Sequence, residues 1–507
     1  MSARSWWGWG TTARALGDEE CAGLAALLGV TDAAPLPPPA VPGLPDPRLR
    51  LPDALRPLAS VADEDRAAHA HGKAYRDVLR NLRGELAHPP DAVLRPRSER
   101  DVVDVLDWAT GGGTPVVPYG GGSSVVGGVE YRGEAPWVSL DLGLLAGVAE
   151  VDATSRAVRV RAGTYGPALE DALRPHGVTL RHFPQSFEFS TVGGWLATRA
   201  GGHYATLHTH IDDAVESLRV VTPAGVSESW RLPASGAGPS PDRLFLGSEG
   251  TLGVITEAWL RVRDRPEHRA GATVGFPDLA RGLAAVRAIA ASGLYPANCR
   301  LLDAGEAALG GASASGETVL VLGFESAHAP VAAALELAVG LARDHGGTPH
   351  ERGDAAGAWR AAFLRMPYVR DGLARAGVLA ETFETACTWD RLPELCDRVR
   401  AELGAALPGG VVNCRLTHAY PDGAAPYFTV LAPARRGGEV AQWDDLKAAA
   451  GELLHAAGAT VTHHHAVGRD HRPWYDRQRP EPFATALRAA KAALDPAGVL
   501  NPGVLID

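Results

Sequence analysis

Cysteine is scarce in this sequence of 507 residues, and so are long apolar runs. The five cysteines are Cys21, Cys299, Cys387, Cys396 and Cys414. They are odd in number and form no Cys-x-x-Cys pair, which argues against a disulfide framework and against a zinc ribbon. No run of about 18 apolar residues occurs, and the start, MSARSWWGWG, has no apolar core of a signal peptide. We therefore expect a cytoplasmic protein without a membrane-spanning helix.

Positive charge does not exceed negative charge, and the formal net charge is -10. The chain therefore has no overall electrostatic reason to bind nucleic acid, and we expect no such partner, although a local basic pocket can still hold a small anion. Lysine occurs only as Lys73, Lys447 and Lys491, which we interpret as coding bias. With 46% hydrophobic residues and this length, we expect two or more domains.

The pattern of the chain predicts an α+β fold. Residues 34 to 49, APLPPPAVPGLPDPRL, hold too many prolines for a helix and should form an extended surface connector. Ser98 and Asp101 form a capping box before a helix over 98–110. Around it we predict strands at 92–96, 114–119, 137–142, 156–163, 217–223 and 254–263. Further along, strands at 272–277, 318–325 and 411–418 alternate with helices at 278–291, 329–345 and 440–457, which is typical of an antiparallel sheet backed by helices.

Three loops rich in glycine, serine and threonine point to a bound dinucleotide. The first, PYGGGSSVVGG at 118–128, follows a predicted strand, and its consecutive glycines let backbone N–H groups converge on a pyrophosphate. It is neither a Gly-x-Gly-x-x-Gly motif nor a Walker A loop, so a Rossmann fold and an ATPase are not indicated. The others are PQSFEFSTVGGWLATRAGG at 184–202 and GSEGTLGVITEAW at 247–259.

These loops, their order and the terminal DPAGVLNPG resemble the FAD-binding PCMH-type domain of the vanillyl-alcohol oxidase superfamily. Within that superfamily the chain is most similar to the alkyldihydroxyacetonephosphate synthase family. The similarity runs through SWWGWG, RAAHAHG, YVRD, ETFETACTWDR, NCRLTHAY and THHHAVG, which lie in the family's order. The resemblance implies an N-terminal segment with the connector at 1–87, an FAD-binding PCMH-type domain at 88–265, a substrate or cap domain at 266–460, and a C-terminal segment at 461–507 that returns to the flavin site.

The resemblance also assigns residues to the FAD site. The FAD would be non-covalent, because the loop at 118–124 has no histidine for the common histidyl linkage. The cofactor-binding residues implied are Pro118, Tyr119, Gly120, Gly121, Gly122, Ser123, Ser124, Pro184, Gln185, Ser186, Phe187, Glu188, Phe189, Ser190, Ala197, Thr198, Arg199, Ala200, Gly247, Ser248, Glu249, Gly250, Thr251, Leu252 and Gly253.

The catalytic set follows from the same resemblance. It implies Tyr427 as acid/base, Arg300 and the triplet His463, His464 and His465 as further catalytic residues, and Arg370 as the ligand of a substrate phosphate. The family exchanges the acyl group of acyl-dihydroxyacetone phosphate for a long-chain alcohol, through a flavin N5 adduct and without net redox change, in ether-lipid synthesis. A tyrosine can act as base there only if cations lower its pKa, and we expect Arg300 and a protonated histidine to do so. Arginine suits the phosphate, because its planar fork makes two charge-assisted hydrogen bonds.

The histidine triplet has a second interpretation as a metal site. In a strand, His463 and His465 face one side and His464 the other, so three adjacent ligands to one ion are awkward, and no companion ligand follows at helical spacing. We therefore expect no metal. A metal-dependent hydrolase on His463 and His465 remains an alternative, as do a core position for Tyr427 and a plain ion pair between Arg370 and Asp371.

The chain also departs from the family pattern. The stretch TRAGGHYATLHTHIDD at 198–213 carries histidines where the eukaryotic enzymes carry lysine, and the ending LNPGVLID is nearer to flavin 2-hydroxy-acid dehydrogenases. An alternative function is therefore an FAD-linked oxidase or dehydrogenase of a hydroxy acid or a secondary-metabolite alcohol. For partners we expect a small lipid-like or phosphorylated substrate and a homodimer, with peripheral membrane contact left open.

Overall fold

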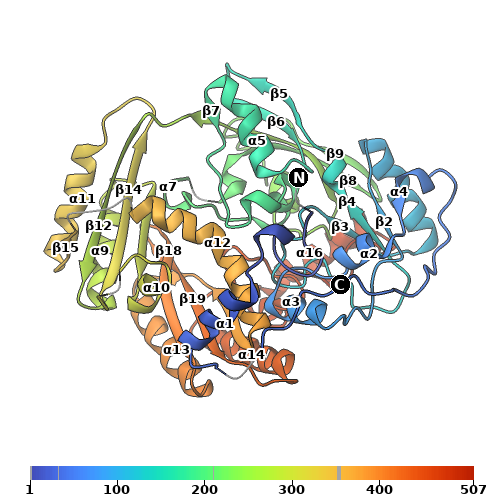
Figure 1. The fold of residues 1–507 in the computed structure, drawn as a ribbon. Coiled ribbons are helices and arrows are strands. Elements are labelled where there is room, and N and C mark those ends of the chain that lie inside the picture. Colours follow the sequence, from blue (N-terminus) through green and yellow to red (C-terminus); the bar gives the residue numbers. More distant parts are fainter. Residues whose placement is uncertain (1–2, 32–33, 209, 314, 351–354) are drawn as a thin grey trace.

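Two sheet-containing halves face one another across a cleft. The computed structural model describes residues 3–31, 34–208, 210–313, 315–350 and 355–507, and of residues 355–362 the backbone only. In Figure 1 the blue and teal elements of the flavin half fill the upper right, and the yellow and orange elements of the second half fill the left and the bottom. The fold is α+β, as predicted from the sequence.

The first sheet of the flavin half is small and largely parallel. Its order is β1 (Ala59–Ser60), β2 (Ala92–Leu94), β4 (Val138–Asp141) and β3 (Val116–Tyr119), with β2, β4 and β3 parallel. Helix α4 (Glu99–Gly112) packs on it through buried positions three and four residues apart. The predicted capping box is confirmed: Ser98 accepts from the Asp101 N–H, and Asp101 accepts from the Ser98 N–H.

The second sheet of the flavin half is antiparallel. Its order is β5 (Val148–Asp152), β6 (Ala157–Arg161), β10 (Val254–Arg261), β8 (Val215–Thr222) and β9 (Gly225–Glu228). The helices of this part are α5 (Gly166–Leu173), α6 (Val192–Thr198), α7 (Ala205–His208) and α8 (Asp242–Phe245), and a short ladder pairs β7 (Val178–Thr179) with β11 (Arg263–Asp264). The two sheets correspond to the two-subdomain FAD-binding domain that the sequence resemblance implies.

The other half is one antiparallel sheet, in the order β15 (Thr348–Pro349), β12 (His268–Phe276), β14 (Thr318–Ser326), β13 (Asn298–Leu302), β18 (Val411–Ala419), β19 (Gly423–Pro433) and β16 (Val378–Glu384), with β17 (Cys387–Thr388) paired to β19. Helices α9 (Leu279–Ala291), α11 (Ala332–Asp344), α13 (Leu392–Ala406) and α14 (Glu439–Ala456) pack on one face and share its apolar core. The prediction of a helix-backed antiparallel sheet is confirmed.

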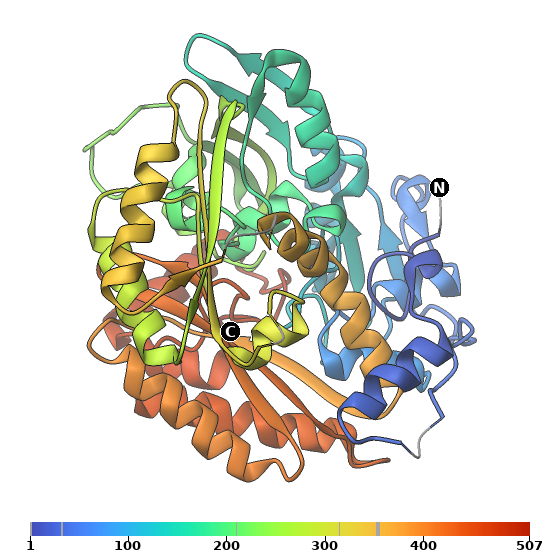
Figure 2. The same cartoon turned by 60° about the vertical axis from the view of Figure 1, so that its left-hand side comes forward.

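Strand alternation sends the polar side chains of this sheet to its other face. Cys299, Leu301, Cys414, Leu416 and Phe428 join the core beneath the helices. Their strand neighbours therefore point the opposite way, toward the flavin half. Helix α12 (Ala355–Arg375) crosses that second face, and α10 (Ala304–Leu309) lies at its edge (Figure 2).

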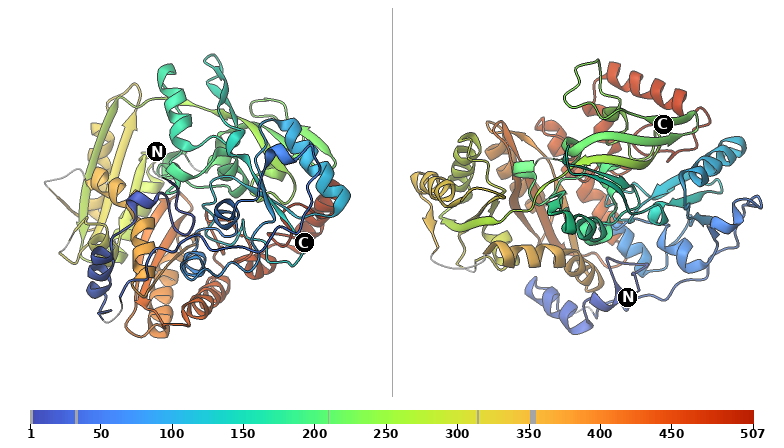
Figure 3. Two further views of the ribbon diagram at one scale, coloured as in Figure 1. Left: turned by 45° about the vertical axis from the view of Figure 1, so that its right-hand side comes forward. Right: turned by 90° about the horizontal axis from the view of Figure 1, so that it is seen from above.

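Both terminal segments tie the halves together. At the N-terminal end lie α1 (Asp18–Leu27), α2 (Asp63–Ala68) and α3 (Tyr75–Leu82), and residues 34–50 contain neither helix nor strand, as predicted. At the other end, α15 (Arg472–Gln478) and α16 (Glu481–Leu494) return to the flavin half, where the red segment lies beside the green strands in Figure 3. Leu500 forms a parallel bridge with Val116, and the Lys491 ammonium donates to the carbonyls of Thr251 and Leu500, both at 2.8 Å.

Each strand and helix that was predicted from the sequence by residue range is present, with ends shifted by a few residues. The further strand assumed for the histidine triplet is wrong. Residues 461–466 form bends without ladder pairing. The local cause is Glu384, whose carboxylate accepts the backbone N–H groups of His463, His464 and His465, so these groups are unavailable to a sheet.

Candidate active site

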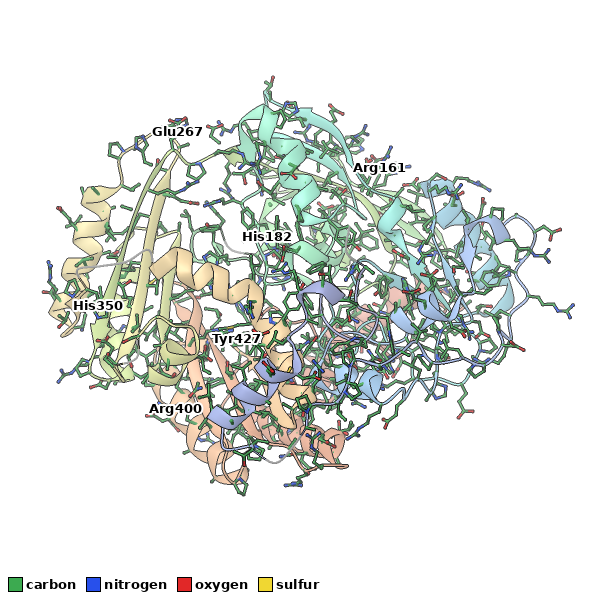
Figure 4. The ribbon with its side chains drawn as sticks, viewed as in Figure 1. Arg161, His182, Glu267, His350, Arg400 and Tyr427 are labelled. Carbon is green, nitrogen blue, oxygen red and sulfur yellow. The ribbon has the colours of Figure 1, made fainter. Side chains whose placement is uncertain are left out.

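A cleft of about 1740 Å³, part of it open to solvent, lies between the halves. The three glycine-rich loops form one wall, and β13, β18, β19, α12 and the histidine segment form the other. In Figure 4, Tyr427 lies near the middle of the molecule, below His182 of the flavin half. The residues that line the cleft thus come from elements far apart in the sequence and from both halves of the molecule.

The first glycine loop follows β3 and lies directly against the second loop. A Cβ atom at Gly121 would lie 1.9 Å from the Phe189 carbonyl oxygen, and one at Gly120 would lie 2.3 Å from the Thr191 hydroxyl oxygen. Gly122 has φ of 67°, which side chains disfavour. These positions require glycine because of close backbone packing. All residues from Pro118 to Ser124 line the cleft, as a cradle of backbone amides requires.

The other two predicted flavin segments contribute only part of their residues to the cleft wall. The lining ones are Pro184, Gln185, Ser186, Ser190, Ala197, Thr198, Ala200, Glu249, Gly250 and Gly253. Phe187 instead packs in the core of the flavin half, Glu188 pairs with Arg14, and Arg199 pairs with Asp212. Phe189, Gly247, Ser248, Thr251 and Leu252 lie outside the lining. The structure thus places these residues behind the cleft wall.

Glu249 joins the third loop to the C-terminal segment. Its carboxylate accepts the backbone N–H groups of Val467 at 2.9 Å and Gly468 at 2.8 Å. Burial raises the pKa of Glu249 to about 7, and the two N–H groups act in the opposite direction. Asn501 adds a second link by donating to the carbonyls of Glu249 and Gly128.

Tyr427 stands on the opposite wall, between two charged residues. In the sheet register it is paired with Arg415 on β18 and with Glu384 on β16, so the three side chains share the face that points to the cleft. Its O–H donates to the Thr382 hydroxyl at 2.9 Å, and the Arg415 guanidinium lies 3.9 Å from the ring centroid. Glu306 holds Arg415 in turn, at 2.6 Å.

The expected activation of Tyr427 is wrong in two respects. The cation beside it is Arg415, whereas the sequence interpretation named Arg300. In addition, burial raises the pKa of Tyr427 despite the opposing charge of Arg415, and burial lowers the pKa of both His464 and His465. The site therefore presents a neutral phenol next to neutral imidazoles.

Arg300 lines the cleft from β13 and is only 2% exposed. Its Nη2 donates to the His203 carbonyl at 3.3 Å, whereas Nε and Nη1 have no hydrogen-bond partner in the part of the chain that the structure describes. Burial and the nearby Arg415 charge lower the pKa of Arg300 to about 9. A buried cation with unused donors is costly unless an anion pairs with it. The site therefore fits an anionic ligand.

Arg370 also lines the cleft, from α12. Both its Nε, at 3.2 Å, and its Nη2, at 2.8 Å, donate to one oxygen of Asp371. The other Asp371 oxygen accepts from the Trp9 N–H at 2.6 Å. Arg370 thus lies in the cleft wall and forms the ion pair with Asp371, whereas its role as ligand of a substrate phosphate stays a prediction.

The histidine triplet is divided between the cleft and the interior. His464 and His465 line the cleft, and their ring centroids lie 6.3 and 5.4 Å from that of Tyr427. His463 lies behind them, with Nδ1 3.0 Å from Nδ1 of His464. Its Nε2 lies 3.2 Å from Nε2 of His210 and 3.0 Å from the Tyr420 hydroxyl.

The histidine segment is not a strand, so strand geometry does not exclude a metal ion there. One ring nitrogen each of His418, His463 and His464 lies within 4.8 Å of the others, a group that can hold a metal ion among the residues described.

Four residues of the site were not identified from the sequence: Thr382, Glu384, Arg415 and His418. All four occur in the motifs ETFETACTWDR and NCRLTHAY, which carried the resemblance. The usable signal was alternation, because Cys414 and Leu416 are buried against the helices, which leaves Arg415 and Thr417 on the cleft face. The alternation breaks at the register shift between Leu416 and His418, after which His418 lines the cleft and Ala419 joins the core.

The comparisons first define a class of protein. The family model described as "FAD binding domain" matches residues 90–228, and the model described as "FAD linked oxidases, C-terminal domain" matches residues 265–505. The chain is therefore an FAD-dependent enzyme in which an FAD-binding domain is followed by the C-terminal domain of FAD-linked oxidases. Among the described residues no helix is long and apolar enough to cross a membrane.

Known relatives then narrow the class. The alkyldihydroxyacetonephosphate synthase of Caenorhabditis elegans is 30% identical, over 87% of this chain and 80% of the relative, and that of Trypanosoma brucei brucei is 29% identical, over 87% and 77%. A solved structure of alkyldihydroxyacetonephosphate synthase superimposes with a TM-score of 0.83 at 24% identity, over 98% of this chain and 97% of the other. This chain belongs to the alkyldihydroxyacetonephosphate synthase family.

Proposed function

We propose that the protein exchanges the acyl group of acyl-dihydroxyacetone phosphate for a long-chain alcohol, with non-covalent FAD in the cleft. The observation that carries this is the convergence of Arg300, Arg415, Tyr427 and His464 on one wall, opposite the glycine loops. Family membership and the names of its relatives support the substrate class. When bound, FAD supplies an oxidised ring that accepts an electron pair and returns it, so that no net redox change results.

For the cofactor, the close approach of Gly120 and Gly121 to the second loop supports a cradle of backbone amides for the FAD pyrophosphate. Residues 118–124 include no histidine, which supports non-covalent binding. The residues assigned to hold FAD are those of the three loops that line the cleft.

For the substrate, we assign the phosphate to Arg370 and the departing carboxylate to Arg300. Arg370 already presents its guanidinium fork to a carboxylate oxygen, and a phosphate can take a place beside it. The unused Nε and Nη1 donors of Arg300 support its pairing with an anion that forms during the reaction.

For proton transfer, we assign the base to the imidazole of His464 or His465 and the acid to Tyr427. Burial lowers the pKa of both histidines, so each imidazole is neutral and has a free nitrogen lone pair that can take a proton, whereas the phenol, whose pKa is raised, starts protonated and can donate. Arg415, over the Tyr427 ring, stabilises negative charge on the phenol oxygen when that proton leaves. This reverses the assignment of Tyr427 as a cation-activated base.

The deciding experiment mixes the purified yellow protein with acyl-dihydroxyacetone phosphate and a fatty alcohol, and measures the ether product by mass spectrometry. The flavin should keep its visible absorbance under anaerobic conditions. Lasting bleaching by a hydroxy acid or alcohol, without ether product, would instead establish the alternative, an FAD-linked oxidase or dehydrogenase. A colourless active protein with stoichiometric zinc would establish a metal-dependent hydrolase.

We further propose a cytoplasmic homodimer that meets membranes peripherally. The described cysteines are all unpaired thiols, which suits a reducing compartment. Trp230 and Leu232, beside β9, are 80% and 53% exposed and offer an apolar contact for a lipid surface. Light scattering tests the dimer, and co-sedimentation with phospholipid vesicles, which Trp230→Ser should weaken, tests the membrane contact.

A further inference from the structure

Three histidine rings form a row that starts at the cleft and ends outside it. His464 lines the cleft, its Nδ1 lies 3.0 Å from Nδ1 of His463, and the far nitrogen of His463 lies 3.2 Å from Nε2 of His210. These are hydrogen-bond distances. His210 precedes the 3-10 helix Ile211–Ala214, whose Asp213 is exposed. The row therefore leads from the cleft toward the surface.

The proposed function, on which this inference rests, gives such a row something to carry. An acyl-dihydroxyacetone phosphate and an alcohol become an ether and a carboxylic acid, and near neutral pH the acid ionises. The alcohol oxygen forms the new C–O bond, the acyloxy C–O bond breaks, and the hydroxyl proton is left over. One proton per turnover must therefore leave the catalytic residues for solvent.

Imidazole can conduct a proton, because it accepts on one ring nitrogen and donates from the other. If His464 takes a proton on Nε2 from the cleft, its Nδ1 proton passes to His463, and the Nε2 proton of His463 passes to His210. His210 then releases its Nδ1 proton to solvent. One proton enters and one leaves, and rotation of the rings restores the starting tautomers. Tyr420, with its hydroxyl 3.0 Å from His463 Nε2, can hold that nitrogen between transfers.

The contacts and pKa directions around the row favour proton sharing over a metal ion. One ring nitrogen each of His418, His463 and His464 lies within 4.8 Å of the others, but both nitrogens of His463 already lie at hydrogen-bond distance from other groups. Burial lowers the pKa of all three relay rings, which keeps them neutral and able to accept a proton. The other titratable and charged groups that act on the row are Arg199, Asp212, Asp213, Glu384, His418, Tyr420 and His465.

We propose that His464, His463 and His210 form a proton relay that carries the proton released in each turnover from the cleft to solvent. His210, which lies in the stretch 198–213 where the chain departs from the family pattern, is its outer member. It touches neither the cleft wall nor Tyr427, so it is a positioning and transfer residue that acts through His463.

The test uses the FAD-loaded enzyme and compares His210→Gln with His176→Gln. Glutamine can still hydrogen-bond His463 but cannot pass on a proton, and His176 is an exposed histidine at the end of the 3-10 helix Arg174–His176. For His210→Gln we expect kcat to fall about tenfold or more, with KM and FAD content unchanged and a larger solvent deuterium isotope effect. Added imidazole should restore most of the rate, and His176→Gln should behave as the wild type.

The outcomes separate the relay from the proposed function. If the wild type makes no ether, the proposed function fails. If the wild type is active and His210→Gln matches it, or slows without imidazole rescue and without an isotope effect, the relay is overturned. A second measurement does not depend on turnover: ¹⁵N NMR of histidine-labelled protein should show N–H···N coupling between ring nitrogens, which His210→Gln reduces. One firmly bound zinc per chain and no such coupling would replace the relay with a metal site.

Discussion

Gly121 and Arg300 line opposite walls of the same cleft, yet different contacts hold them there. At Gly121 the backbone of one loop lies against the backbone of another, and there is no room for a Cβ atom. At Arg300 a long side chain leaves a strand and ends with two unused donors. The wall formed by the glycine loops is thus defined by close backbone packing. The wall that carries Arg300 is defined by its charged and titratable side chains. Changes on the first wall should alter cofactor binding, and changes on the second should alter rate.

The strongest test of this comparison is Gly121→Ala. The added carbon would overlap the Phe189 carbonyl, which belongs to the backbone and cannot turn aside, so the two loops must separate at a cost of roughly 3 kcal/mol or more. We expect purified protein with little or no FAD, measured by absorbance after denaturation. Gly111→Ala on α4, where nothing lies within 4 Å, is the control and should remain fully yellow. Normal FAD content in Gly121→Ala would show that close backbone packing at Gly121 does not control cofactor binding.

The next largest effect is expected on the other wall. Tyr427→Phe removes the proton donor but keeps the ring between Arg415 and His465, so kcat should fall about 10²–10⁴-fold with FAD retained. Steady-state ether formation measures this. Tyr295→Phe, at a residue 64% exposed, should change nothing. Unchanged turnover in Tyr427→Phe would make the assignment of the acid wrong.

A smaller, substrate-selective effect is expected from Arg370→Ala. A hydrogen bond from a charged donor contributes about 1.5–3 kcal/mol to binding. Its loss should raise KM for phosphorylated substrate roughly 10- to 100-fold. An analogue without phosphate should be bound equally by wild type and variant. Arg365→Ala on the same helix, whose exposed side chain pairs with Glu20, is the matched control. Equal losses for both substrates would show that Arg370 serves α12 and not the phosphate.

The smallest expected effect concerns stability and pH. The pKa of Glu249 is raised to about 7 in the folded chain, above its ordinary value. The folded state therefore holds this proton more firmly, a stabilisation present at low pH and lost as pH rises toward 7. We compare the Tm of the wild type with that of Glu249→Gln. Between about pH 5 and 7.5 the wild type should lose a few degrees in Tm relative to the variant. A constant difference in Tm would contradict the raised pKa.

The residues of the glycine-loop wall could be predicted from the sequence better than those of the opposite wall, for a physical reason. Each flavin loop is contiguous, so a run such as Gly120 to Gly122 can be recognised from adjacent residues alone. The partners of Tyr427 come from two other strands, and the pairing with Arg415 and Glu384 depends on strand register, which no single segment contains. The prediction of a strand for the histidine triplet was wrong for the same reason. Its conformation is imposed by Glu384, which lies on a strand distant in the sequence.

The C-terminal segment has a consequence for how the enzyme is made. Glu249 is bonded to Val467 and Gly468, the triplet is bonded to Glu384, and Val116 is bridged to Leu500. Both walls of the cleft therefore depend on residues that are synthesised after all the strands named above. On the ribosome the flavin half can collapse early, but the finished site has to form after those residues emerge from the exit tunnel. A chain stalled before residue 461 would lack the triplet and should be inactive, so catalysis starts only once synthesis has passed this point.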